Sequence, residues 1–165
     1  MSHTPLRLRE LLERLTQAEI RFVLVGGLAV NAWGHLRGTK DVDVVPDPSS
    51  DNLALLDSVL RDLGGKVEVG ERHLDSAAIS TFLRAGDRTY VATDLGYVDV
   101  LQGLPQIPPF GVLDAAAKEV DLDGLRVRVC SLDHLREMKR NSDRARDRDD
   151  LEALESAQAG EQEKG

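Results

Sequence analysis

Apolar residues along the chain follow two periods, one typical of helices and one typical of strands. Residues 5–18 repeat leucine mostly at i, i+3 and i+4 among Arg and Glu, which predicts an amphipathic helix. Residues 22–25 form the continuous apolar run FVLV, which favours a buried strand. Residues 28–33 have helical composition, and residues 41–45 alternate Asp and Val with the period of a strand. The pattern therefore predicts helix, strand, helix and strand in the first quarter of the chain.

The remaining pattern predicts further helices and strands joined by irregular loops. Helices are expected over residues 51–63, 112–118, 132–140 and 143–154. Strands are expected over residues 79–84, 89–93, 97–101, 120–122 and 125–130, with a short edge strand within 66–73. This order predicts one α/β or α+β domain, in which helices pack on a mixed β-sheet.

Composition narrows the class of protein. The 165 residues suffice for one domain with its own core, and 41% hydrophobic with 30% charged residues indicates a soluble globular chain. No apolar run approaches the length of a membrane span, and residues 1–15 lack the apolar region of a signal peptide. Cys130 is the single cysteine, which excludes a disulfide framework and favours the cytoplasm. The net charge of −8 does not favour a broad nucleic-acid surface.

Three aspartates lie inside strand-like apolar runs. Asp41 and Asp43 share one face of their strand, because strand side chains repeat every two residues. Like charges this close raise each other's pKa, and a hard divalent cation removes the conflict. Asp99 lies between Val98 and Val100 in another predicted strand. If the two strands are neighbours, the three carboxylates can hold two Mg²⁺ ions, or Mn²⁺, for a phosphoryl-type transfer.

A glycine pair precedes the aspartates. Gly26-Gly27 ends the first predicted strand and opens a helix, an arrangement that exposes backbone N–H groups to a phosphate. The pair is followed by 13 residues, then Asp-x-Asp, then a later strand aspartate. This combination is far more specific than either motif alone.

These motifs carry a resemblance to a known superfamily. The stretch VGGLAVNAWGHLRGTKDVDVV resembles the DNA polymerase β-type nucleotidyltransferases, and within them the small bacterial enzymes related to AbiEii abortive-infection toxins. The segment SLDHLREMKRNSDRARDRDDLEAL is similar to the carboxy-terminal helices of that family, where a Lys precedes Arg-x-x-Asp-x-x-Asp. Those positions are here Lys139, Arg144, Asp147 and Asp150. The resemblance covers residues 20–154 and implies the nucleotidyltransferase fold, a mixed sheet flanked by helices with further helices at the C-terminus.

The resemblance also implies a role for each site residue. Asp41 and Asp43 would bind both metal ions, and Asp99 would bind the catalytic metal and help deprotonate the acceptor hydroxyl. The nucleotide-binding residues would be Gly26, Gly27, Arg37, Thr39, Lys40 and Lys139. The second glycine stands where other members carry Ser, so phosphate contact there rests on the backbone alone. The alternative for Lys139 and Arg144 is a salt-bridged helix face, with Arg144 paired to Asp147 or Asp150.

The predicted organisation is a single nucleotidyltransferase domain over residues 1–156, with its core at 20–101 and its C-terminal helices at 131–156. Residues 157–165 are polar and predict a flexible tail.

The predicted activity is metal-dependent transfer of NMP from an NTP to an acceptor hydroxyl. The toxin-like resemblance implies tRNA or another cellular acceptor, and a cognate antitoxin as partner in a type IV toxin–antitoxin pair. A small-molecule acceptor is the alternative, because the aminoglycoside and lincosamide nucleotidyltransferases share the same core. A third hypothesis is a non-catalytic module that binds a nucleotide or a partner.

Overall fold

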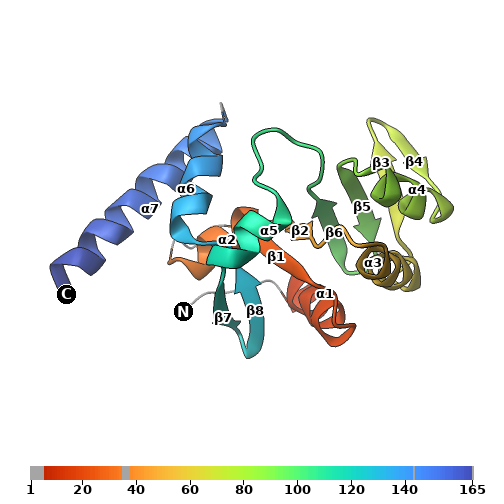
Figure 1. Ribbon diagram of the computed structural model, residues 1–165, viewed down its shortest axis with the longest axis horizontal. Coiled ribbons are helices and arrows are strands. Elements are labelled where there is room, and N and C mark those ends of the chain that lie inside the picture. Colours follow the sequence, from red (N-terminus) through yellow and green to blue (C-terminus); the bar gives the residue numbers. More distant parts are fainter. Residues whose placement is uncertain (1–5, 35–37, 143, 165) are drawn as a thin grey trace.

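The protein folds around one mixed β-sheet. The computed structural model describes residues 6–34, 38–142 and 144–164, with side chains described from residue 7 to residue 156 within these ranges. Within these ranges eight strands form a sheet in the order β4-β3-β5-β6-β2-β1-β8-β7 (Figure 1). The strands are β1 (Phe22–Val25), β2 (Asp41–Pro46), β3 (Lys66–Val69), β4 (Arg72–Leu74), β5 (Thr89–Thr93), β6 (Gly96–Val100), β7 (Lys118–Leu122) and β8 (Leu125–Val129). The helices are α1 (Leu6–Gln17), α2 (Gly26–Ala32), α3 (Ser50–Asp62), α4 (Ala77–Ala85), α5 (Phe110–Ala116), α6 (Leu132–Arg140) and α7 (Ala145–Lys164). The predicted mixed α/β architecture is confirmed.

The centre of the sheet is built from the most apolar strands. β1 pairs antiparallel with β2 and parallel with β8, while β2 pairs parallel with β6. Every residue of β1 is buried, as its continuous apolar run predicts. In β2, Val42 and Val44 are buried on one face of the sheet, so Asp41 and Asp43 must point to the other face. The alternation of β2 therefore fixes the side of the sheet on which its carboxylates lie.

One predicted strand is wrong. Residues 79–84 belong to helix α4, which ends at Gly86 with a left-handed φ of 73°. Ile79 and Leu83, four residues apart, are both buried and form the inner face of this helix. A short segment with apolar residues at positions 79, 82 and 83 does not by its period distinguish a strand from one face of a short helix.

The boundaries of the later elements also differ from the prediction. Helix α5 ends at Ala116, so Lys118 lies in strand β7 rather than in the helix. The expected edge strand is a hairpin of β3 and β4. Helix α7 continues to Lys164, beyond the predicted end at residue 154, while its predicted start at Asp143 lies outside the described residues.

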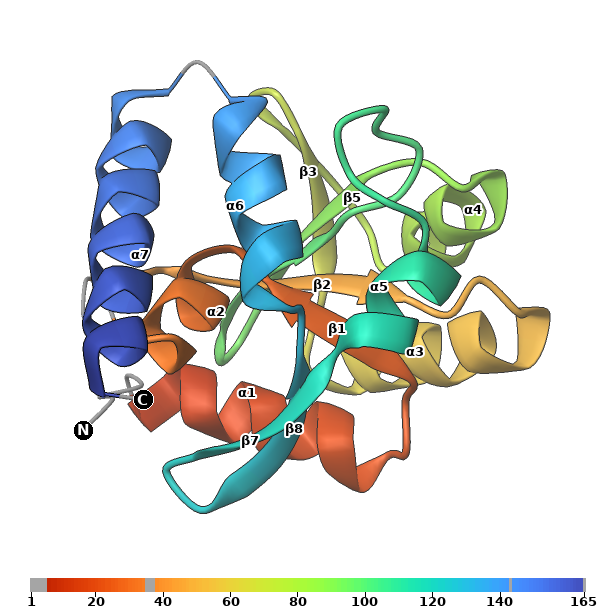
Figure 2. The ribbon, with the colours of Figure 1, turned by 60° about the vertical axis from the view of Figure 1, so that its left-hand side comes forward.

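Helices α6 and α7 form one end of the molecule. Ser131 caps α6, its hydroxyl oxygen accepting a hydrogen bond from the His134 N–H. The two helices lie side by side, and α6 also contacts α2 (Figure 2). The hairpin β3–β4 and helix α4 lie at the opposite end (Figure 1). The helix pair thus stands beside the face of β2 that carries the aspartates.

Candidate active site

The three aspartates meet on adjacent strands. In the parallel pairing of β2 with β6, Asp43 lies directly opposite Asp99 and Asp41 lies opposite Tyr97. Residues opposite each other on neighbouring strands point to the same face, so the Asp43 and Asp99 carboxyl groups share one patch with that of Asp41. Two segments more than fifty residues apart in the sequence are thereby brought into one acidic site.

The carboxyl groups are held in a state unfavourable to their charge. Burial, followed by the charges of Asp99 and Asp41, raises the pKa of Asp43 from 3.8 to about 7. Burial is also the main cause that raises the pKa of Asp41, while a hydrogen bond from Tyr90 partly opposes it. The Asp43 Oδ1 atom is buried and has no hydrogen-bond partner among the described residues. The cluster therefore lacks a positive charge at Asp43.

Gly26 makes the close approach to this carboxylate possible. It begins helix α2 with a φ of 69°, and a Cβ built on it would lie 1.8 Å from Asp43 Oδ2. No other residue type fits here without moving the backbone, because the contact is far inside van der Waals distance. Gly27 is buried in the first turn of the same seven-residue helix. Glycine at position 26 thus lets the main chain at the start of α2 lie against the Asp43 carboxylate.

Two polar residues that the sequence did not reveal lie at the start of strand β5, Arg88 directly before it and Tyr90 within it. The Arg88 guanidinium donates from Nε to Asp99 Oδ1 over 2.9 Å and from Nη2 to Oδ2 over 2.7 Å, and this pairing is the main cause that raises its pKa. The Tyr90 hydroxyl donates to Asp41 Oδ1 over 3.1 Å. The alternation of side chains in this segment could have revealed them. Arg88 and Tyr90 flank the buried Thr89 and so share one face, and β5 pairs antiparallel with β6, which carries Asp99.

The partners divide the carboxylates into two classes. Both oxygens of Asp99 are engaged by Arg88, and only 8% of the Asp99 side chain is exposed. Arg88 itself is 53% exposed and lies with its guanidinium carbon 5.9 Å from the ring centre of Tyr90. Asp99 is thus paired with the Arg88 guanidinium, which has room to move toward solvent. Asp43 has no such partner.

Lys139 lies across from the strands on helix α6. Its Nζ is 2.5 Å from Asp147 Oδ1 and 3.0 Å from Asp150 Oδ2, both on α7, and its side chain is 7% exposed. Arg144 pairs with Asp147 over 2.7 Å, as the alternative reading of this segment predicted. Burial disfavours the charge of Asp147, but hydrogen bonds from Lys139, Ser142 and Arg144 outweigh it and lower the pKa of Asp147 to about 2.

The other predicted nucleotide-binding residues lie before β2. The Thr39 hydroxyl donates to the backbone oxygen of Asp41 over 3.3 Å, and Lys40 is exposed. Neither lines the cavity described below. Arg37 lies outside the described residues. The backbone oxygen of Gly38 accepts a hydrogen bond of 2.6 Å from Arg146, which ties this approach to the start of α7.

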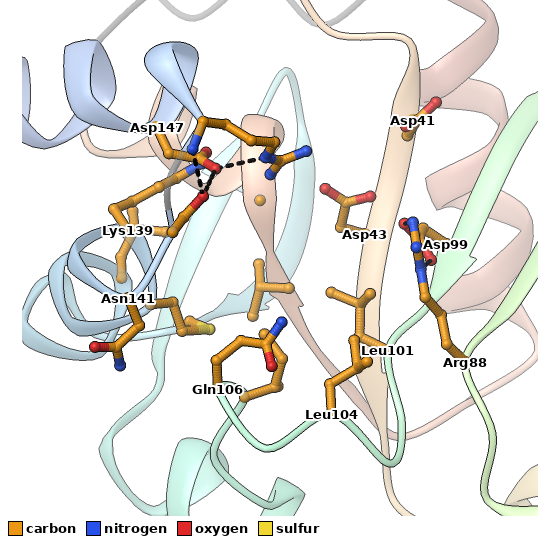
Figure 3. A pocket seen from close by; sticks show the side chains of 17 residues that line it. Asp41, Asp43, Arg88, Asp99, Leu101, Leu104, Gln106, Lys139, Asn141 and Asp147 are labelled. Carbon is orange, nitrogen blue, oxygen red and sulfur yellow. Dashed lines mark hydrogen bonds and ion pairs between the residues drawn. The ribbon is translucent and has the colours of Figure 1, made fainter.

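A cavity of about 450 Å³ lies between the aspartates of the strands and the ion pairs of Lys139 and Arg144 on the helix side. We call it the site cavity. Figure 3 shows Asp43, Asp99 and Arg88 on its strand side and Lys139, Asn141 and Asp147 on its helix side. Gly26 and Arg144 also line it, so most of the predicted site residues reach one space. The remaining lining is mainly apolar and comes from Val25, Leu101, Leu104, Ile107, Leu135 and Met138.

The carboxylate oxygens of Asp41 and Asp43 suit a hard divalent cation. Asp41 and Asp43 offer oxygen ligands, and the unpartnered, buried Asp43 Oδ1 is the atom a cation would satisfy. Among the described residues, no three acidic, His or Cys side chains already stand close enough together to hold a metal ion. At this site Arg88 occupies both oxygens of the third carboxylate, that of Asp99.

Comparison with known proteins identifies the family. Residues 4–163 match the family described as "Nucleotidyl transferase of unknown function" (DUF2204). The chain belongs to this family. The enzyme class predicted from the glycine pair and the aspartates is therefore confirmed, and the AbiEii-like subtype stays a prediction. A comparison with curated protein sequences found no match.

Solved nucleotidyltransferases share the fold of this family member. The lincosamide antibiotic adenylyltransferase LnuA, in its lincomycin-bound crystal structure, superposes with a TM-score of 0.64 at 18% identity, over 93% of this chain and 98% of LnuA. The crystal structure of ANT(2")-Ia with adenylyl-2"-tobramycin gives 0.56 at 13% identity, over 95% of each chain. TM1012 from Thermotoga maritima gives 0.55 at 15% identity, over 94% of this chain and 88% of TM1012. At these identities the likeness concerns the fold.

No helix in the described part of the chain is both long and apolar enough to cross a bilayer.

Proposed function

We propose that this nucleotidyltransferase uses divalent magnesium to transfer NMP from a nucleoside triphosphate to a hydroxyl group of a small-molecule acceptor. The observation that carries the proposal is the register of β2 and β6, which sets Asp43 opposite Asp99 at the edge of the site cavity. A cluster of carboxylates with raised pKa values beside a cavity is typical of a catalytic site rather than of a structural one.

Asp41 and Asp43 would hold the magnesium ion. Once bound, the ion would neutralise charge on the transferred phosphate and on the leaving pyrophosphate. Asp99 would join these ligands only after Arg88 releases it, and it lies next to the apolar part of the cavity where an acceptor would enter. Asp99 would therefore accept the proton of the attacking hydroxyl.

The helix side of the cavity would bind the nucleotide phosphates. Lys139 is buried and already compensated by two carboxylates, whereas the Arg144 side chain is 80% exposed and lines the same cavity. A guanidinium also matches phosphate oxygens better than a single ammonium. Arg144 is thus the better phosphate ligand, with Lys139 holding the helices in place and the backbone at Gly26 completing the opposite wall.

A small molecule is the acceptor favoured by the cavity. Its walls near Asp99 are apolar, from Leu101, Leu104 and Ile107, and offer few hydrogen-bond partners to an RNA chain. The net charge of −8 also opposes binding of a polyanion. The lincomycin-bound and adenylyl-tobramycin-bound structures of similar fold support the same class of acceptor.

RNA is the second candidate, as expected from the toxin-like resemblance. A hollow of about 520 Å³ between α6 and α7 is lined by Arg140 and Arg148 and adjoins the site cavity through Lys139 and Ser142. Such a basic hollow suits a phosphate of tRNA, and in that case a cognate antitoxin would be the protein partner. Binding of tRNA that weakens steeply with salt would favour this candidate.

The proposal is tested by incubating the protein with each α-labelled NTP, Mg²⁺ or Mn²⁺, and three acceptors: lincomycin, tobramycin and bulk tRNA. Label transfer with pyrophosphate release is expected with a small-molecule acceptor, and none with the Asp41→Asn, Asp43→Asn double variant. Full activity of that double variant would refute the assigned site. Absence of both NTP binding and transfer in the wild type would refute the proposed function.

A further inference from the structure

A second hollow adjoins the site cavity on its acceptor side. It has a volume of about 240 Å³ and lies between the end of β2 and the loop of residues 101–109. The β2 side is formed by Val45, Pro46 and Pro48, and we call this space the apolar hollow. It shares Leu101, Leu104 and Ile107 with the site cavity, so the two spaces are neighbours across these side chains.

The apolar hollow has almost no polar side-chain surface of its own. Gln102 is the polar side chain among the described residues that line it. The amide nitrogen of Gln102 already lies 3.4 Å from two backbone oxygens, those of Leu83 and Asp87. A ligand group that enters the hollow therefore meets mainly carbon surface with some polar main-chain atoms, and an alkyl or aryl group gains about 25 cal/mol for each Å² of apolar surface removed from water.

The distance from the hollow to the reacting carboxylate follows from the strand geometry. The Leu101 N–H donates to Val44 O over 2.9 Å, which extends the pairing of β2 with β6 one residue past Val100. Leu101 therefore points to the same face as Asp99, roughly 7 Å further along the strand. A molecule with its hydroxyl at Asp99 places a neighbouring group against Leu101 and into the hollow.

The walls of the hollow are rigid before any ligand arrives. Prolines 46, 48, 108 and 109 fix φ along both sides. Gly103 has a φ of 68°, and a Cβ there would lie 2.7 Å from Gly86 O, so the loop packs tightly against the end of α4. The Ile107 N–H also closes a turn onto Leu104 O over 3.1 Å. A preformed pocket binds with little ordering of the protein.

We propose that the apolar hollow is a subsite for the acceptor, which is a small hydroxyl compound carrying an alkyl or aryl group long enough to extend from Asp99 past Leu101. This inference rests on the proposed function, because the hydroxyl is placed at Asp99. The subsite selects acceptors by their apolar part, whereas Asp99 selects only the hydroxyl.

The subsite is tested by titrating the ¹⁵N-labelled protein with hexan-1-ol and, as the polar probe, with glycerol. Hexan-1-ol is expected to shift the amide signals of Gly103, Leu104, Ile107 and Phe110, and glycerol is expected to leave them unchanged. Phe110→Glu places a charge in the hollow and is expected to weaken hexan-1-ol binding at least about five-fold. The matched control is Val112→Glu, two residues along the same helix, which lines neither space.

Shifts confined to other regions, no shifts, or equal weakening by both charged variants would overturn the subsite. If Phe110→Glu gives no folded spectrum, Leu104→Asn in the loop takes its place with the same expectation. ATP with Mn²⁺ is added to the same sample, and paramagnetic broadening at Asp41 and Asp43 is expected. Loss of this broadening alone counts against the proposed function, whereas loss of the hexan-1-ol shifts alone counts against the subsite.

Discussion

Two groups of charges face each other across the site cavity, and they are in opposite energetic states. On the strand side, three carboxylates are accompanied by one guanidinium, and the pKa of Asp43 is raised to about 7. On the helix side, Asp147 and Asp150 are matched by Lys139 and Arg144, and the pKa of Asp147 is lowered to about 2. The same residue type is thus destabilised as an anion in one group and stabilised in the other.

The difference separates a structural role from a binding role. In the helix group the two negative charges are matched by two positive charges. A further cation would stabilise it little, and its ion pairs hold α6 against α7. The strand group carries an uncompensated negative charge, so a divalent cation lowers its free energy most. Charge balance therefore favours the strand group over the helix group as the proposed metal site, and the predictions below test this distinction.

The largest expected effect is on catalysis. Asp43→Asn removes the carboxylate that lacks a partner, and we expect NMP transfer to fall about 1,000-fold, or about 4 kcal/mol in the barrier. Initial rates with saturating NTP and Mg²⁺ measure this. Asp57→Asn, which alters a surface ion pair with Arg61 on α3, is the control and should keep full activity. A transfer rate within three-fold of the wild type would contradict the assignment.

The second effect concerns the balanced group. Lys139→Met leaves two buried carboxylates without their shared cation, so we expect the free energy of unfolding to fall by about 3–5 kcal/mol. Urea denaturation measures it, with the exposed Arg140→Met as control. If Lys139 served the nucleotide instead, stability would change by less than about 1 kcal/mol while the KM for NTP rose.

The third effect is a pH dependence of opposite sign in the two groups. The pKa of Asp43 is raised in the folded state, so without metal its contribution is present at low pH and lost as pH rises through about 7. We expect the wild type to lose about 1–2 kcal/mol relative to Asp43→Asn between pH 5 and 8, after allowance for partial solvent exposure.

For Asp147 the folded pKa is lowered, so its contribution is present above the unfolded value and lost as pH falls toward 2. Asp147→Asn should therefore be less stable than the wild type at pH 6, with the difference shrinking below pH 4. Urea titrations in EDTA across the pH range measure both variants. Parallel curves for the wild type and Asp43→Asn would show that Asp43 is not strained.

The smallest effect tests the pairing of Arg88 with Asp99. Arg88→Gln removes a cation that occupies both oxygens of Asp99, so we expect Mn²⁺ to bind three- to ten-fold more tightly, or about 1 kcal/mol. Electron paramagnetic resonance of free Mn²⁺ measures the affinity without any turnover. The exposed Arg84→Gln is the control. Weaker Mn²⁺ binding by Arg88→Gln would mean that Arg88 positions Asp99 for the ion.

The sequence predicted the features that depend only on residues close together in the chain. The period of two in residues 41–45 placed Asp41 and Asp43 on one face, and the apolar run of residues 22–25 predicted a buried strand; the structure has both. The glycine pair and the aspartates also predicted the enzyme class correctly. These features succeed because side-chain alternation and glycine backbone freedom act within a few residues.

The sequence did not reveal what depends on strand order and burial. Arg88 and Tyr90 reach the site because β5 pairs with β6 and β6 pairs with β2, and no local pattern specifies this second pairing of distant segments. Lys139 lies among acidic and basic residues, as an exposed helical lysine does, yet its side chain is buried between α6 and α7. Residues 79–84 were predicted as a strand because six residues with only three apolar positions are too few to fix the period.

The contact of Gly26 with Asp43 has a consequence for reading other genomes. A Cβ at position 26 would lie 1.8 Å from the Asp43 carboxylate, so Asp43 in this conformation requires glycine at position 26, whereas glycine makes no demand on position 43. A homologue that replaces this glycine is expected to have lost the aspartate, turned its side chain or rebuilt the first turn of α2. Position 26 is therefore the first place to look, in a related sequence, for loss of the proposed metal site.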